Sequence, residues 1–206
     1  KTVGAPIVNV HGSLDETPED SIYESQQLVI STRTLPFNDW KKTRVYASVA
    51  EFLYFNKIAQ IPLMVLNSLE KIEFRELFEH FLNNSDKHEI LKKIKINLQG
   101  HAEQIAEGKS EFLYKEGYLD IYWPPGEFEY IKLVIDQKLD QFYDEFKEHY
   151  VKFCKSKLNR EIFEESLDLN RKLMRLPRDE KDEVHEGNFN ILENYHQILK
   201  LNKPKF

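Results

Sequence analysis

The chain has 206 residues, of which 41% are hydrophobic and 13% aromatic. This composition excludes a disordered segment and is sufficient for one domain, or slightly more, with a buried core. There are 29 Lys and Arg against 35 Asp and Glu, a net charge of −6. Because duplex binding needs a clustered basic face and the lysines here are interspersed with carboxylates, we expect no nucleic-acid partner.

A single cysteine, Cys154, excludes an internal disulfide and a cysteine-based metal or cluster site. In its helical stretch, a small buried hydrophobe is the expected role. No apolar run approaches the roughly 20 residues that span a bilayer, and no signal peptide is recognisable. We therefore expect a cytoplasmic protein without a membrane partner. The chain begins at Lys1 rather than Met, which suggests further sequence upstream.

Two parts are predicted along the chain. Residues 1–36 form the first, with an extended lead-in over residues 1–21 and a strand over residues 22–33, where apolar residues partly alternate. We expect this part to pack on the helices or on a missing upstream domain. Pro36 ends the strand, and residues 37–206 are predicted to be a helical domain.

The first helices of that domain follow from the 3.6-residue period of apolar side chains. The first is predicted to be capped by Asn38 or Asp39 and to run to about Asn56. Beyond this helix, Pro62 is predicted to break or kink the chain. Two further helices are predicted, from about residue 69 to 83 and from 85 to 108. Residues 111–123 are aromatic and contain a Gly, which leaves a hairpin or an irregular loop open.

The longest predicted helix begins at Pro124-Pro125-Gly126-Glu127 and continues to residue 153. Its apolar residues step by three and four, and about 28 residues would make a rod of roughly 42 Å. Asn159 is expected to cap the last long helix, and residues 189–201 to form a short one. The sequence thus predicts a mainly α fold, a bundle of about six helices with a short N-terminal strand.

The search for chemistry finds little. A di-iron bundle needs a Glu-x-x-His motif from each of two helices, whereas the acidic residue three before a His is here Asp182 before His185, in a predicted loop. Glu76/His80 and Glu145/His149 have a one-turn spacing that more often forms a solvated pair than a metal site. Nucleotide-binding and hydrolase motifs are absent. We expect no catalytic residue and no metal ligand, and a di-metal bundle is only a third interpretation.

His11 has a distinctive setting, an apolar run flanked by Gly ahead of the strand. A buried His there would need a hydrogen-bond partner, which Glu24 or a backbone carbonyl could provide. It could instead face a cofactor or substrate held by another domain. The chemistry alone favours the structural role.

Several segments in order resemble the region downstream of the catalytic barrel in radical SAM proteins of the cobalamin (B12)-binding-domain type. They are His11-Gly12-Ser13, Glu24, Leu28-Val29-Ile30-Ser31-Thr32, Thr34-Leu35, Asp39-Trp40-Lys41, Gln60 and Phe74-Arg75-Glu76-Leu77-Phe78-Glu79. The likeness covers roughly residues 8–82. Leu35 replaces a common Met, and Phe74 and Phe78 replace tyrosines.

The resemblance implies an accessory C-terminal domain, inactive alone, of an enzyme that cleaves S-adenosylmethionine reductively at a [4Fe–4S] cluster, often with cobalamin. The family's Cys-x3-Cys-x2-Cys loop is missing, so this chain is expected to bind none of these cofactors, and its partner would be an upstream catalytic domain of the same polypeptide. We expect five residues nearest that domain or its pocket: His11, Glu24, Arg33, Thr34 and Trp40. The alternative is a free-standing acidic helical interaction module without catalytic activity.

Overall fold

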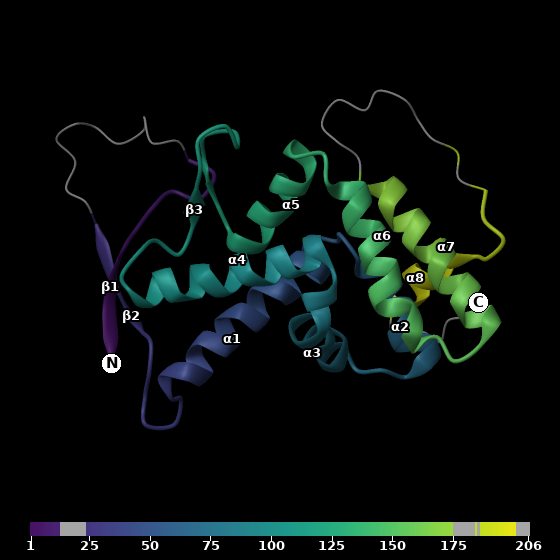
Figure 1. The fold of residues 1–206 in the computed structure, drawn as a ribbon, viewed down its shortest axis with the longest axis horizontal. Helices are drawn as coiled ribbons and strands as arrows, with labels where there is room; N and C mark the ends of the chain where they lie inside the picture. Colours follow the sequence, from purple (N-terminus) through teal and green to yellow (C-terminus); the bar gives the residue numbers. More distant parts are fainter. Residues whose placement is uncertain (13–23, 175–183, 185, 201–206) are drawn as a thin grey trace. The chain divides into compact units, whose positions relative to one another are not determined.

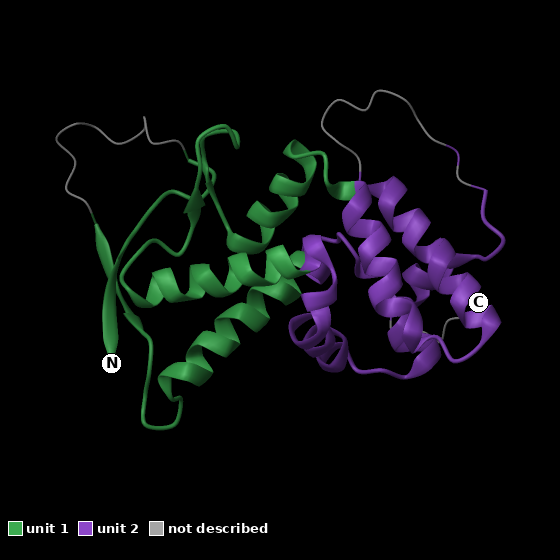
Figure 2. Cartoon of the chain, in the orientation of Figure 1, with its two compact units in different colours: residues 1–52, 92–139 green, residues 53–91, 140–206 purple. Residues whose placement is uncertain are grey.

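A computed structural model describes residues 1–12, 24–174, 184 and 186–200 (Figure 1). They form eight α-helices and four short strands. The chain divides into two compact units, residues 1–52 with 92–139 (unit 1) and residues 53–91 with 140–206 (unit 2) (Figure 2). The predicted mainly α fold with an N-terminal strand element is confirmed, with eight helices instead of about six. The sequence suggested a division at residue 36, whereas the strand pair shares a unit with the first helix.

Unit 1 contains the four strands and three helices. Its elements are β1 (Thr2–Pro6), β2 (Ser25–Val29), α1 (Phe37–Ala50), most of α4 (Glu89–Ala106), β3 (Leu113–Tyr114), β4 (Tyr122–Trp123) and α5 (Pro125–Ile135). A π-helical segment, Glu51–Phe55, continues α1.

Unit 2 is helical throughout its described part. Its elements are α2 (Gln60–Glu70), α3 (Phe74–Asn84), α6 (Leu139–Tyr150), α7 (Lys157–Leu173), α8 (Ile191–Leu199) and the 3₁₀ turns Ser85–Lys87 and Val151–Phe153.

The ribbon of β1 and β2 is antiparallel, with Thr2 opposite Val29 and Pro6 opposite Ser25. Side chains of the inner face pack against a buried cluster of Ile30, Trp40 and Ile105. Because a two-stranded ribbon is marginally stable in water, this packing on helical residues stabilises it. Trp40, only 8% exposed, therefore anchors the start of α1 to the ribbon.

The N-terminus of α1 differs from the prediction. Pro36 is the cap residue, its carbonyl accepts from the N–H groups of Asp39 and Trp40, and this helix has no side-chain cap in the described structure. The predicted cap by Asn38 or Asp39 is therefore wrong. Asp39 lies in the first turn instead, where its charge favours the helix dipole.

The predicted 42 Å rod does not exist, because α5 and α6 are separate helices. Gln137 adopts φ +55°, its N–H donates to the Val134 carbonyl, and the N–H of Lys138 donates to the Leu133 carbonyl at 2.7 Å. This is the pattern of a Schellman motif, which ends a helix and satisfies its last carbonyls. Gly usually occupies this left-handed position. Because Gln137 occupies it here, the sequence showed no helix end between α5 and α6.

Two other predictions shift at helix ends. Pro62 lies in the first turn of α2, where its missing N–H costs nothing, so the chain breaks before it. Ser156, whose side chain accepts from the Asn159 N–H at 3.0 Å, caps α7 in place of Asn159. Of the two possibilities left open for residues 111–123, the structure shows the hairpin, with β3 antiparallel to β4, and the short last helix is present as α8.

The buried amide of Asn170 is the main polar junction of unit 2. Its Oδ1 accepts from the Ile61 N–H at 3.1 Å, at the start of α2. Its Nδ2 donates to the carbonyls of Lys57 and Ile58 at 3.0 and 2.8 Å. Tyr143 of α6 also donates to the Ile58 carbonyl. One side chain of α7 thus fixes the turn that begins α2.

We predict that Asn170→Ala lowers the free energy of unfolding by about 2–4 kcal/mol, because several buried backbone groups lose their partner. Denaturant unfolding followed by circular dichroism measures it. The matched control is Asp168→Ala, an exposed position two residues earlier, with an expected change within about 0.5 kcal/mol. Equal effects of the two substitutions would contradict the role of Asn170.

Gly108 ends α4 at φ +89°, and a Cβ there would lie 2.8 Å from the Gly4 carbonyl oxygen of β1. Gly117 has a similar φ, +81°, with open space around its Cβ position. Gly117→Ala should cost only the left-handed strain, about 1–2 kcal/mol. Gly108→Ala should cost clearly more, since the backbone contact adds to it. Equal losses of unfolding free energy would show that the ribbon does not approach Gly108.

Candidate functional site

The five predicted site residues all belong to unit 1, but the structure does not gather them into one site. His11, Glu24, Arg33 and Thr34 are exposed, whereas Trp40 is buried in the core. Trp40 thus has a structural role in the described fold. The other four lie at the surface, on or beside the ribbon and the turn that follows it.

The side chain of His11 is half exposed. Its ring bonds neither to Glu24 nor to a backbone carbonyl, the two partners expected from the sequence. Nε2 donates to Glu127 Oε2 at 3.0 Å, and the ring meets Trp123 edge-on at a centroid distance of 5.4 Å. The His11 N–H donates to the Tyr122 carbonyl. Glu24 instead uses its carbonyl to accept from the Ile7 N–H. His11 therefore joins the lead-in to the hairpin and the start of α5.

Thr34 belongs to a tight turn between β2 and α1. The Oγ1 of Thr32 accepts from the N–H groups of Thr34 and Leu35 at 3.2 and 3.0 Å. A Thr side chain that accepts from backbone groups two and three residues ahead stabilises such a turn. The turn presents Arg33 and Thr34 to solvent.

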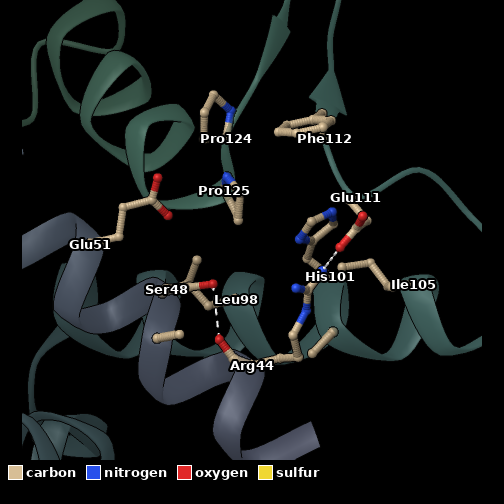
Figure 3. A pocket seen from close by; sticks show the side chains of 12 residues that line it. Arg44, Ser48, Glu51, Leu98, His101, Ile105, Glu111, Phe112, Pro124 and Pro125 are labelled. Atoms are coloured by element: carbon tan, nitrogen blue, oxygen red, sulfur yellow. Dashed lines mark hydrogen bonds and ion pairs between the residues drawn. The ribbon is translucent and has the colours of Figure 1, made fainter. Parts of the chain in front are cut away.

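A cavity of about 370 Å³ lies elsewhere in unit 1, between α1, α4 and the segments that flank the hairpin (Figure 3). Three groups of residues line it: Arg44, Ala47, Ser48 and Glu51 from α1 and its continuation; Leu98, His101, Ala102 and Ile105 from α4; Glu111, Phe112, Pro124 and Pro125 beside the hairpin. Its volume lies in the range of small-molecule sites. The five predicted residues are not among these lining residues.

One end of the cavity holds an ion pair. Arg44 Nη2 donates to Glu111 Oε1, and Gln26 of β2 donates to Glu111 Oε2 at 2.8 Å. Figure 3 shows the two charged side chains meeting beside the ring of His101. Both oxygens of Glu111 are thereby used, and the charge of Arg44 is balanced.

His101 is 5% exposed, and burial lowers the pKa of its imidazole to about 4. The ring has a hydrogen bond to the Ser110 backbone, while Nε2 is buried without a partner among the described residues. A neutral imidazole with one unused nitrogen can bond a ligand. It is too weak a base at neutral pH to remove protons efficiently.

Glu51 lies at the opposite end from the ion pair, about two turns beyond Arg44, at the start of the π-helical continuation of α1. Its Oε2 accepts from the Gly126 N–H at 3.3 Å. Burial, reinforced by the charge of Glu127, raises the pKa of Glu51. Ser48, between the two ends, donates to the Arg44 carbonyl and is not activated by a base. The arrangement is therefore suited to binding rather than to nucleophilic chemistry.

Sequence reasoning missed this cavity, although one signal was present. Arg44, Ser48 and Glu51 have the i, i+4, i+7 spacing of one helix face. The residues that oppose them, His101 and Glu111, lie some fifty residues or more further along the chain. Only the packing of α4 and the hairpin segment brings them together.

Histidines singled out as candidate ligands meet in unit 2. The rings of His80 and His149 stack at a centroid distance of 4.2 Å, and His88 lies 5.1 Å from His149. Glu145 turns away and accepts from the N–H groups of Ile90 and Leu91 at the start of α4. Among the described residues no three His, Cys, Asp or Glu side chains form a metal-binding group. Asp182 and His185 lie outside the described residues.

Burial lowers the pKa values of these two imidazoles, to about 4 for His80 and about 3 for His149. The charges of Lys152 and His88 lower both pKa values further, and the charge of His80 lowers that of His149. The Nε2 atoms of both rings are buried without a hydrogen-bond partner in the described structure. The fold therefore requires both rings to be neutral.

Comparison with known proteins leaves the family open: no protein-family model matches this chain, and neither does any curated protein. In the described residues, no single helix is long and apolar enough to cross a membrane. Only Phe37–Phe55 and Gln60–Glu70 taken together, across the break between them, reach that length and composition.

We predict that unfolding free energy rises with pH between about 4 and 6.5, because the unfolded chain there binds protons that folded His80 and His149 exclude. The contribution is complete above pH 6.5 and is lost as pH falls toward 4 and below. His101, whose pKa burial also lowers to about 4, contributes in the same direction, so with all three histidines the slope reaches up to roughly 4 kcal/mol per pH unit.

His149→Phe should remove about a third of that slope, since Phe keeps the aromatic packing without a proton site and His80 and His101 still titrate. His196→Phe, an exposed position on α8, is the control. Denaturant unfolding at a series of pH values measures both. An unchanged slope in His149→Phe would rule out this pair as its origin.

Proposed function

We propose that this chain is an accessory helical domain of a radical SAM enzyme of the cobalamin-binding-domain type, which covers the active site or shapes the substrate pocket. Catalysis would belong to an upstream domain of the same polypeptide. The proposal rests on the ordered resemblance over residues 8–82 and on the surface that this stretch presents.

The observation that carries the proposal is exposed apolar surface on the ribbon and its flanking segments. Ile7 is 50% exposed, Val29 56%, Val10 39% and Leu35 36%. Val29 lies on the ribbon face opposite to the one that packs on Trp40. Val10 and Leu35 are chain neighbours of His11 and Thr34, and the Ile7 N–H donates to the Glu24 carbonyl. Exposed apolar side chains near four of the predicted residues support contact with another domain.

The [4Fe–4S] cluster of the proposed enzyme does not fit this chain's own residues. A [4Fe–4S] cluster requires cysteine thiolates, and Cys154 is alone in the sequence. Burial, with the nearby charges of Glu70 and Glu164, raises the pKa of Cys154 to about 11, which disfavours the thiolate. The cluster, S-adenosylmethionine and cobalamin would thus belong to the rest of the polypeptide.

The alternative, a free-standing interaction module, would be supported by an exposed apolar strip along residues 128–153. Phe142, Tyr143, Phe146 and Tyr150 are instead almost completely buried, and α5 and α6 are separate helices. The feature that would have favoured this alternative is therefore missing from the described structure.

A helical cover of this kind would exclude water and oxygen from a radical intermediate. We predict that Val29→Asp or Leu35→Asp in the full-length enzyme raises S-adenosylmethionine cleavage that is not coupled to product, by several-fold, because the cover docks less tightly. The ratio of cleavage to product in anaerobic assays measures this.

Leu192→Asp is the matched control, since Leu192 of α8 is also exposed, at 46%, but lies in unit 2. Circular dichroism verifies that all three variants fold. A ratio that is unchanged in Val29→Asp and Leu35→Asp, or raised equally in Leu192→Asp, would contradict docking through the ribbon surface.

A further inference from the structure

We propose that the cavity of unit 1 binds a small organic amine, a monocation with an apolar body of about two fused rings. The inference rests on the cavity's own charges and walls and does not depend on the proposed function.

The charges that line the cavity leave one carboxylate unbalanced. Arg44 and Glu111 neutralise each other, and Gln26 occupies the second oxygen of Glu111. His101 contributes no charge at neutral pH. Glu51 remains, and the interactions of the described residues with it include no cationic partner. The lining therefore has a net charge of about −1, which a singly positive ligand would balance.

The position of Glu51 favours a direct contact with such a ligand. Its Oε2 bonds to the backbone N–H of Gly126, a neutral donor at 3.3 Å. Glu127, one residue further, places a second carboxylate nearby and helps to raise the pKa of Glu51. A bound ammonium group would relieve both the desolvation and the repulsion, so the carboxylate is poised for a cation.

The other walls suit an apolar body. Leu98, Ile105, Phe112 and the two prolines Pro124 and Pro125 surround the space between the polar ends (Figure 3). About 370 Å³ accommodates two fused rings with a short side chain. Flat rings pack well against Phe and Pro.

His101 provides a second polar contact. His101 lines the cavity and is only 5% exposed, and its Nε2 lacks a hydrogen-bond partner among the described residues. That nitrogen has almost no accessible surface, so an N–H group on the ligand's ring would bond to it after a small rotation of the imidazole. The preferred ligand thus carries an ammonium group at one end and a ring N–H at the other.

Tryptamine is the first probe, and tryptophol and indole-3-acetate are its matched analogues. They share the indole and differ in the head group: ammonium, hydroxyl and carboxylate. Titration of the 206-residue chain at pH 7, followed by two-dimensional amide NMR, gives affinities and the location of binding. We expect tryptamine to bind most tightly, indole-3-acetate least, and the shifted amides to lie around residues 44–51 and 98–112.

Glu51→Gln should weaken tryptamine binding about tenfold and leave tryptophol unchanged, because a charged hydrogen bond is replaced by a neutral one. Glu103→Gln is the control, an exposed carboxylate of α4 that pairs with Lys41 outside the cavity lining. Three results would overturn the proposal: no tryptamine binding, equal affinities for the three compounds, or equal weakening by Glu51→Gln and Glu103→Gln. None of them bears on S-adenosylmethionine cleavage, so this proposal and the proposed function can fail separately.

Discussion

The carboxylate of Glu111 joins the separate pieces of unit 1. One oxygen accepts from Arg44 of α1 and the other from Gln26 of β2, while the residue itself leads into the hairpin. Three segments that are remote in sequence thus share one side chain, which is largely buried. Removing Arg44 would leave the largely buried carboxylate of Glu111 without its cation, which costs more than never forming the pair. The ribbon, the first helix and the cavity wall therefore share one polar junction, in addition to the apolar packing on Trp40.

This junction also determines the electrostatics of the cavity. Because Glu111 neutralises Arg44, the guanidinium is not available as a simple anion site, and Glu51 becomes the dominant charge. The same unit presents a second, unrelated surface at the ribbon. An apolar outer face and an anionic cavity are compatible with a domain that docks on another and also holds a small molecule.

Local patterns predicted the helical character and left the hairpin as one of two possibilities. They missed helix ends at which an unusual residue type adopts the required backbone geometry. Gln137 has the left-handed backbone conformation that Gly usually adopts at a helix end, as Gly108 does at the end of α4. Without a Gly, nothing in the sequence indicated that the helix ends there. Pro62 was interpreted as a breaker although the first turn of a helix tolerates it. The cavity could not be predicted from the sequence, because only tertiary packing brings His101 and Glu111 close to Arg44. His11 was noticed for its setting, yet its partner Glu127 lies 116 residues away.

The most direct test of the proposed function is to determine the coding sequence upstream of residue 1 and to assay the complete polypeptide, prepared without oxygen. We predict a Cys-x3-Cys-x2-Cys loop within a repeating strand–helix pattern, iron in the purified protein, and reductive cleavage of S-adenosylmethionine. A reading frame that begins with Met within a few residues of Lys1, or a complete protein without those cysteines and without cleavage, would contradict the accessory-domain assignment.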